Sequence, residues 1–288
     1  MGNRSPEHSV TPGAGIRRSA LATHRAELVP PALGPYLRQI RESIRQPGSN
    51  KHLSREKAAT RIGLSAAYLQ QIENGTRVPT QQALQLLASG YSLSAAQIRH
   101  IRELRQPAVP LVGLDTMRAR VTHTPALLER LDDLHRVDML AGYFSPLWHV
   151  LATNSSLERA LPGLREAGNL ALWHFTPTAH EVLIDWDQEA TQMVQWLKAV
   201  LGLHRSAPAA RQLLAALHTD EEFYTRWSDS TEVTYRRDPQ RPLILRTTPG
   251  DRIAMNVETS TVTDTHGYIR LFLGVRKPAD GAGTQSNR

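Results

Sequence analysis

The stretch from Gly63 to Gly75 constrains the fold of this chain most strongly. It reads GLSAAYLQQIENG, with a turn glycine, a serine suited to a helix N-cap, an amphipathic run and a closing Asn-Gly. The run before it starts at another capping serine, Ser54, and ends at Gly63, where a positive φ is easy for glycine. Two short helices joined by a tight glycine turn are the pattern of a helix-turn-helix.

Three further helical runs surround this pair. Residues 33–45 repeat apolar residues at helical spacing, and residues 80–90 run from a threonine cap to a glycine stop. Residues 94–104 begin with serine and place glutamine three positions later, which is a capping box. The spacing therefore predicts a compact all-α domain of five helices within residues 33–106.

The positive charge of the chain lies almost entirely in its first third. Residues 1–110 hold 15 Lys/Arg and 6 Asp/Glu, whereas residues 111–288 hold 19 and 21. A basic segment joined to a near-neutral one suggests a module that binds a polyanion, attached to a second domain. From charge alone, a basic solvated surface is an equal alternative.

Beyond the first domain the pattern changes to helices followed by strands. A proline-containing linker is expected at 107–116, and an α+β domain with an antiparallel sheet at 117–277. Residues 1–32 and 278–288 are polar segments that we expect to be disordered. The expected helices are 124–135, 186–204, 207–218 and 220–229, and the expected strands are 137–144, 146–153, 242–247, 252–260 and 268–275.

Composition and missing motifs exclude several classes of protein. The chain has no cysteine, no apolar run long enough for a membrane helix and no secretory signal, so we expect a cytoplasmic, nucleoid-associated protein without membrane insertion. It contains no G-x-S-x-G, P-loop or G-x-G-x-x-G motif. The run HEVLID resembles the start of a zinc-protease motif, but Asp185 stands in place of the second histidine. We therefore expect no enzyme activity, no metal and no cofactor.

Residues 33–93 resemble the XRE, or lambda-repressor-like, family of DNA-binding domains. The resemblance rests on LGPYLRQIRE, LSREKAATRIGLS, QIENGTRVP and ALQLLASGYSL. It implies that the helix after Gly63 lies in the major groove of double-stranded DNA. It also implies that Arg41 and Glu73 form an ion pair that braces this helix, and that Arg55, where the family usually has glutamine, contacts a phosphate.

The candidate reading residues lie on the second helix of the motif. Gln70 and Gln71 have side chains that can bond adenine, whereas Ala66 and Ala67 offer only apolar contact. A solvated helix face is the alternative for each glutamine. Because two alanines discriminate weakly, a homodimer or DNA shape would supply the missing specificity. The predicted DNA-contacting residues are Arg55, Ser65, Ala66, Ala67, Tyr68, Gln70, Gln71, Asn74 and Arg77.

Residues 117–276 are similar to the MmyB-like ligand-binding domain of actinobacterial transcription regulators. The similarity rests on PLWHVLATNSSLERAL, GNLALWHF, DWDQEATQMVQWLKA, EEFYTRW and the final strands. It implies a PAS-like fold and a fatty-acid-like ligand, since a member of the family is known with a fatty acid bound. The chain departs from the family pattern at Thr153-Asn154 and Leu197-Lys198, where Trp-Asn and Leu-Arg are usual.

Large apolar residues outside the strands are candidates for a ligand pocket, and ordinary core packing is the alternative for each. The predicted pocket residues are Trp148, Asn154, Phe175, Trp186, Trp196, Phe223, Trp227 and Met255.

The whole pattern predicts a sequence-specific, ligand-responsive transcription regulator that binds DNA as a homodimer. The alternative is a DNA-binding protein whose second domain is a ligand-free module for dimerisation or protein interaction. An enzyme is the least favoured of the three because nucleophile and metal patterns are missing.

Overall fold

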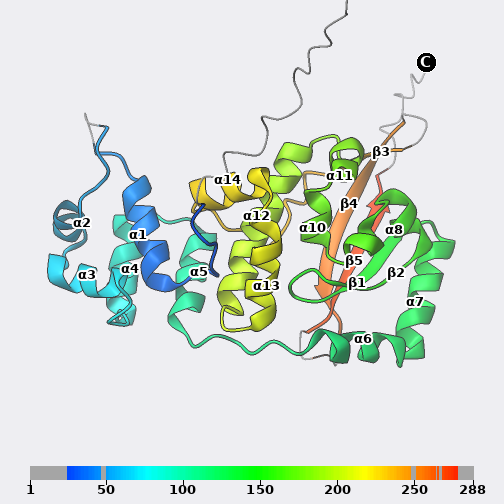
Figure 1. Ribbon diagram of the computed structural model, residues 1–288, viewed down its shortest axis with the longest axis horizontal. Coiled ribbons are helices and arrows are strands. Elements are labelled where there is room, and N and C mark those ends of the chain that lie inside the picture. The colour runs from blue at the N-terminus through cyan, green and yellow to red at the C-terminus, as the bar shows by residue number, and fades with distance from the viewer. Residues whose placement is uncertain (1–24, 47–49, 248–250, 264, 266–267, 278–288) are drawn as a thin grey trace, which may run out of the picture.

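The computed structural model describes residues 25–46, 50–247, 251–263, 265 and 268–277. Two lobes lie side by side along its long axis, with the N-terminal helices at one end and the sheet at the other (Figure 1). The long helix of the second lobe, α12 (Trp186–Leu203), stands between them and contacts α5 (Ala95–Arg105) of the first.

The first lobe is all-helical, which confirms the predicted fold class. Its helix-turn-helix is formed by α2 and α3, and the connecting Gly63 has a φ of 79°. Serine and threonine side chains cap four of its helices, and Ser94 and Gln97 form both halves of the predicted capping box. Its elements are α1 (Leu33–Ser43), α2 (Arg55–Ile62), α3 (Ala66–Glu73), α4 (Gln81–Gly90) and α5 (Ala95–Arg105).

Small residues let these helices approach closely. Ala58 and Ala59 of α2 are buried where α3 crosses. A β-carbon added at Gly34 of α1 would lie 2.6 Å from the carbonyl oxygens of both Ile72 and Glu73. The first helix therefore packs directly on the end of α3 and fixes its position.

The second lobe is an α+β domain, which also confirms the prediction. Its antiparallel sheet has the strand order β2-β1-β5-β4-β3, so the last strand in the sequence lies at the centre. The strands are β1 (Leu140–Phe144), β2 (Val150–Thr153), β3 (Leu243–Arg246), β4 (Arg252–Thr261) and β5 (Arg270–Arg276).

Helices cover both faces of the sheet. Leu271 points to one face, where it packs with residues of α6 (Leu114–Thr122) and α7 (Pro125–Arg136). Its neighbour Phe272 points to the other, because side chains alternate along a strand. That second face carries the larger core, formed with α8 (Ser155–Ala160), α9 (Leu164–Ala167), α10 (Leu170–His174), α11 (Pro177–Val182), α12, α13 (Pro208–Leu217) and α14 (Glu221–Asp229).

Two segments differ from the sequence-based expectation. The linker expected at 107–116 gives way to α6 at Leu114, and Val109 exchanges hydrogen bonds with α12 through the carbonyl of Leu203 and the ring of His204. Residues 25–32, expected within a disordered segment, lie without helix or strand structure against the second lobe, where Leu28 packs on its core. Residues 1–24 and 278–288 lie outside the described residues.

Candidate nucleic-acid interface and ligand cavity

The helix α3 has one buried face and one exposed face. Leu69 and Ile72 are buried in the core of the first lobe, together with Glu73. Gln70, Gln71 and the following Asn74 are exposed, and so is Ala67. The exposed face thus carries side chains that can donate to and accept from base edges.

The carboxylate of Glu73 anchors the buried face of α3. It is fully buried and accepts hydrogen bonds from Arg41 at 2.6 Å and 3.1 Å. Arg55 adds a third bond, from its Nε to Glu73 Oε2 at 3.0 Å. The guanidinium of Arg41 also donates to the carbonyl of Leu53 at 2.8 Å. Two arginines from different helices therefore hold one carboxylate of the reading helix.

Arg55 has a different setting from that implied by the family resemblance. Its side chain is 26% exposed, and its charge already pairs with Glu73. Arg77, in contrast, is exposed and forms no ion pair with a described carboxylate. The charge of Arg77 is therefore more available to contact a phosphate than the charge of Arg55.

The remaining predicted DNA contacts include residues with structural tasks. Ser65 caps α3 by accepting from the backbone of Tyr68 at 3.1 Å. The hydroxyl of Tyr68 accepts from the backbone of Thr80 at 3.3 Å, and Arg77 lies over its ring. Ala66 is half-buried against the core. The freest reading positions are therefore Ala67, Gln70, Gln71 and Asn74.

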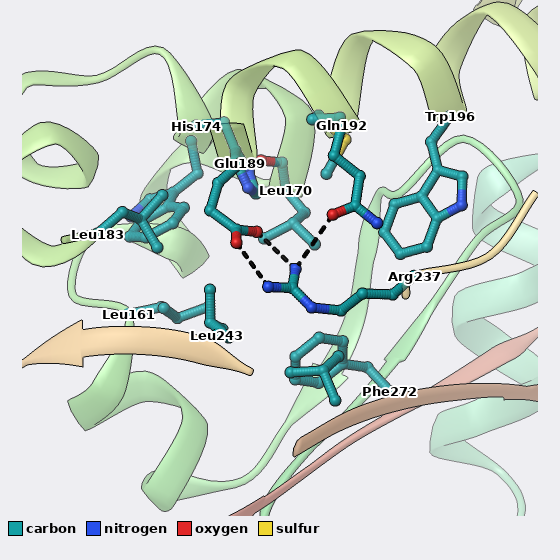
Figure 2. Close-up of a pocket in the computed structure, with 13 residues that line it drawn as sticks. Leu161, Leu170, His174, Leu183, Glu189, Gln192, Trp196, Arg237, Leu243 and Phe272 are labelled. Atoms are coloured by element: carbon teal, nitrogen blue, oxygen red, sulfur yellow. Dashed lines mark hydrogen bonds and ion pairs between the residues drawn. The ribbon is translucent and has the colours of Figure 1, made fainter. Parts of the chain in front are cut away.

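The second lobe contains a mostly apolar cavity between α10, α12 and strands β3 to β5 (Figure 2). The volume open to the centres of water molecules is about 30 Å³, which is enough for one or two waters. Its walls are Leu161, Leu170, Trp173, His174, Leu183, Glu189, Gln192, Met193, Trp196, Arg237, Leu243, Val257 and Phe272.

An ion pair crosses this apolar setting. Figure 2 shows the guanidinium of Arg237 directed at the carboxylate of Glu189. Its two terminal nitrogens each donate to one carboxylate oxygen at 2.5 Å. Arg237 also lies 3.5 Å from Gln192 Oε1 and donates to the carbonyl of Arg241 at 3.0 Å. Both charged side chains are nearly buried. Burial lowers the pKa of the neighbouring His174, whose Nδ1 lies 2.7 Å from the carbonyl of Leu170.

A polar cleft lies on the other side of Arg237. The volume of this cleft open to the centres of water molecules is about 550 Å³. Arg236 and Arg241 are among its lining residues. Because Gln192 and Arg237 line both hollows, their side chains form the wall between them. Movement of Arg237 would therefore join the cleft to the cavity.

Of the eight predicted pocket residues, Trp196 lines this cavity. Trp148 packs against it, with ring centres 5.0 Å apart. Asn154 caps α8 and also bonds the backbone of β1, so its side chain is engaged in the fold. Met255 is buried in the core, and the rest form a separate series of ring contacts among Phe175, Trp186, Phe223 and Trp227.

The sequence reasoning missed Arg237 and Glu189. These residues are 48 positions apart, so no local spacing joins them. The sequence offered one signal for this ion pair, the carboxylate of Glu189 within the amphipathic run that forms α12.

Comparison with known protein families decides the identity. Residues 123–287, more than half of the chain, match the MmyB-like transcription regulator ligand binding domain. The chain belongs to this family.

The N-terminal part of this MmyB-like regulator matches a helix-turn-helix domain at residues 32–101. The two matches together make it a DNA-binding transcription regulator with a ligand-binding domain. A comparison with curated proteins found no match. Within the described part of the regulator, every helix is too short or too polar to span a lipid bilayer.

Proposed function

We propose that this regulator binds its operator by placing α3 in the major groove, where Gln70, Gln71 and Asn74 contact base edges. The observation that carries the proposal is the exposed polar face of a helix whose opposite face is buried. Glu73 keeps this face in one orientation through its two arginines. Such pre-organisation reduces the entropy lost on binding.

The charge distribution supports this choice of partner. The first 110 residues carry a net charge of +9, which attracts the phosphate backbone. One short helix contacts few base pairs, so we expect two copies of the chain to occupy paired half-sites about one helical turn apart. A footprint on DNA would measure the protected length, and protection of a single half-site would contradict the dimer.

Gln71→Ala and Arg77→Ala separate readout from phosphate contact. Loss of Gln71 should reduce the preference for operator over random DNA by about 1–3 kcal/mol, because a bidentate base contact disappears. Loss of Arg77 should weaken binding to both DNAs equally and lower the salt dependence by about one unit. Gln212→Ala, an exposed glutamine of α13, is the control. An unchanged preference in Gln71→Ala would place sequence readout elsewhere.

For the second lobe we propose a fatty-acid-like ligand, with its carboxylate at Arg237 and its chain among the leucines of the cavity. A guanidinium with a fork of donors suits a carboxylate. The ligand would replace Glu189 as the partner of Arg237 and enter from the polar cleft. Because the cavity is small, the apolar walls must separate as the chain enters. No metal or other cofactor and no catalytic step is part of this proposal.

The alternative is a ligand-free module for dimerisation or protein interaction, and the small volume of the cavity favours it. Mass spectrometry of lipid extracts and thermal shifts with myristate distinguish the two. A ligand site predicts a rise in Tm with myristate that is lost in Arg237→Gln and absent with myristyl alcohol. No shift with any chain length, and no lipid in the extract, would leave the ligand-free module.

A further inference from the structure

A third hollow lies where the two lobes meet. Segment 27–32, helix α1, helix α12 and helix α14 all contribute to its wall. Its volume open to the centres of water molecules is about 210 Å³, far larger than that of the cavity beside Arg237. Apolar groups line most of it, including Leu28, Pro31 and Trp227.

One buried cation faces this hollow. Lys198 of α12 is 4% exposed and lines the wall. Its ammonium donates to the carbonyl of Ser230 and lies 5.4 Å from the centre of the Trp227 ring. An ammonium has three donors, and Lys198 forms no ion pair with a carboxylate of the described residues. Burial lowers its pKa to about 8, although Glu232 and Asp229 act in the opposite direction.

The acceptor of Lys198 belongs to a segment of the second lobe that contacts the first lobe. We call residues 228–231, which begin with the last two residues of α14, the junction loop. Its backbone carbonyls hold the DNA-binding lobe: Gln39 donates to Ser228 at 2.7 Å, and the hydroxyl of Tyr36 donates to Thr231 at 2.7 Å. The carbonyl that Lys198 occupies thus lies between the two that hold α1.

We propose that this hollow is a second ligand site, which takes a small monocarboxylate with an apolar body. The carboxylate pairs with Lys198, and the body packs against Trp227 and the prolines of segment 27–32. Glu27 also lines the hollow, so a second negative charge on the ligand would be repelled. A buried, hydrogen-bonded cation beside apolar walls is the usual arrangement for such an amphiphile.

Occupancy would act on the junction loop. A carboxylate attracts the ammonium more strongly than a neutral carbonyl does, so it competes with Ser230 for Lys198. The backbone of Ser230 would then shift between the two carbonyls that hold α1, and the orientation of the DNA-binding lobe would change with it. This effect on DNA rests on the proposed function, whereas the site itself does not.

Titration calorimetry without DNA tests the site. The probes are phenylacetate and hexanoate, with 2-phenylethanol as the uncharged match. We expect both carboxylates to bind and the alcohol to bind at least about tenfold more weakly. Lys198→Met, which keeps the apolar stem, should weaken the carboxylates by about tenfold or more, while Arg237→Gln should leave them unchanged. Absence of binding at millimolar probe, or dependence on Arg237 in place of Lys198, would overturn the proposal.

Glu27→Gln gives a second variant at an exposed position, so its folding is secure. Removing this negative charge should tighten carboxylate binding a few-fold and leave the alcohol unaffected. Equal affinities for wild type and Glu27→Gln would contradict the placement of the carboxylate.

Hydrogen exchange locates the bound probe, and DNA titration then tests coupling. Phenylacetate should change exchange in residues 25–39 and in the junction loop, with no change in residues 186–193. A change confined to residues 186–193 would assign the probe to the other cavity and refute the site. If DNA affinity is the same with the hollow empty and saturated, the coupling fails while the site remains.

Discussion

The buried carboxylate of Glu73 gives the sharpest test of how the reading helix is held. Glu73→Gln keeps the shape of the side chain and removes its charge. Arg41, with a side chain only 6% exposed, then has no buried anion as partner. Arg55 is more exposed and can turn to water. The loss should therefore arise mainly at Arg41.

The structure sets the size of the effect. Removing one partner of a buried ion pair costs about 3–5 kcal/mol, because the other charge is left uncompensated. Arg41 keeps two acceptors, the carbonyl of Leu53 at 2.8 Å and Glu42 Oε1 at 3.1 Å. We therefore expect the lower end, about 3 kcal/mol. That free energy corresponds to about a 100-fold change in an equilibrium constant.

Hydrogen exchange is the suitable assay because all five tryptophans lie in the other lobe. The slowest amides of α3 should exchange about 100-fold faster in Glu73→Gln. Arg38→Gln, which breaks only the exposed pair with Glu42 on the same helix α1, should cost less than about 0.5 kcal/mol. A change of the same small size in Glu73→Gln would refute the bracing role. The double variant Arg41→Met with Glu73→Met gives a second test, because apolar replacement of both partners of a buried ion pair is expected to be tolerated. A larger loss of stability in this double variant than in Glu73→Gln would also refute the bracing role.

Two further predictions concern the packing of the lobes. Burial lowers the pKa of His100, with smaller contributions from Lys198 and Arg205, from 6.5 to about 4. The unfolded chain therefore binds the proton first. The stability from neutral His100 is present above pH 6.5 and falls by about 2 kcal/mol on acidification to pH 5. The free energy of unfolding, measured by urea titration, should therefore fall more steeply on acidification in wild type than in His100→Leu. The same pH dependence in both proteins would contradict this prediction. Gly34→Ala should lower the stability of the first lobe by more than about 2 kcal/mol, because its methyl would meet two backbone carbonyls at 2.6 Å. An unchanged Tm for that lobe would show that α1 can move away from α3.

Local signals predicted the DNA-binding lobe well. Capping serines, the turn at Gly63 and helical spacing all act within a few residues, and the structure has the expected helices at each place. The five expected strands are also present. For the caps and the turn, the pattern in the sequence and the contact in the structure both lie within a few residues of each other.

The missed elements depend on contacts that are distant in the sequence. Helices α8 to α11 have only four to six residues each, too few for a periodic pattern to appear. Leu28 is held by the core of a lobe that begins about 90 residues later. Arg237 meets Glu189 only because the loop before β3 returns to α12. Aromatic content identified the core of the second lobe and did not distinguish cavity walls from filled core.

The central position of β5 has a consequence for the order in which the lobes form during synthesis. Its partners are β1, made some 130 residues earlier, and β4, so the sheet cannot close until residues 270–276 have left the ribosome. The DNA-binding lobe, built from contacts close in sequence, can fold well before that moment. For the time needed to translate the second lobe, a nascent chain would carry a folded DNA-binding head that nothing yet controls.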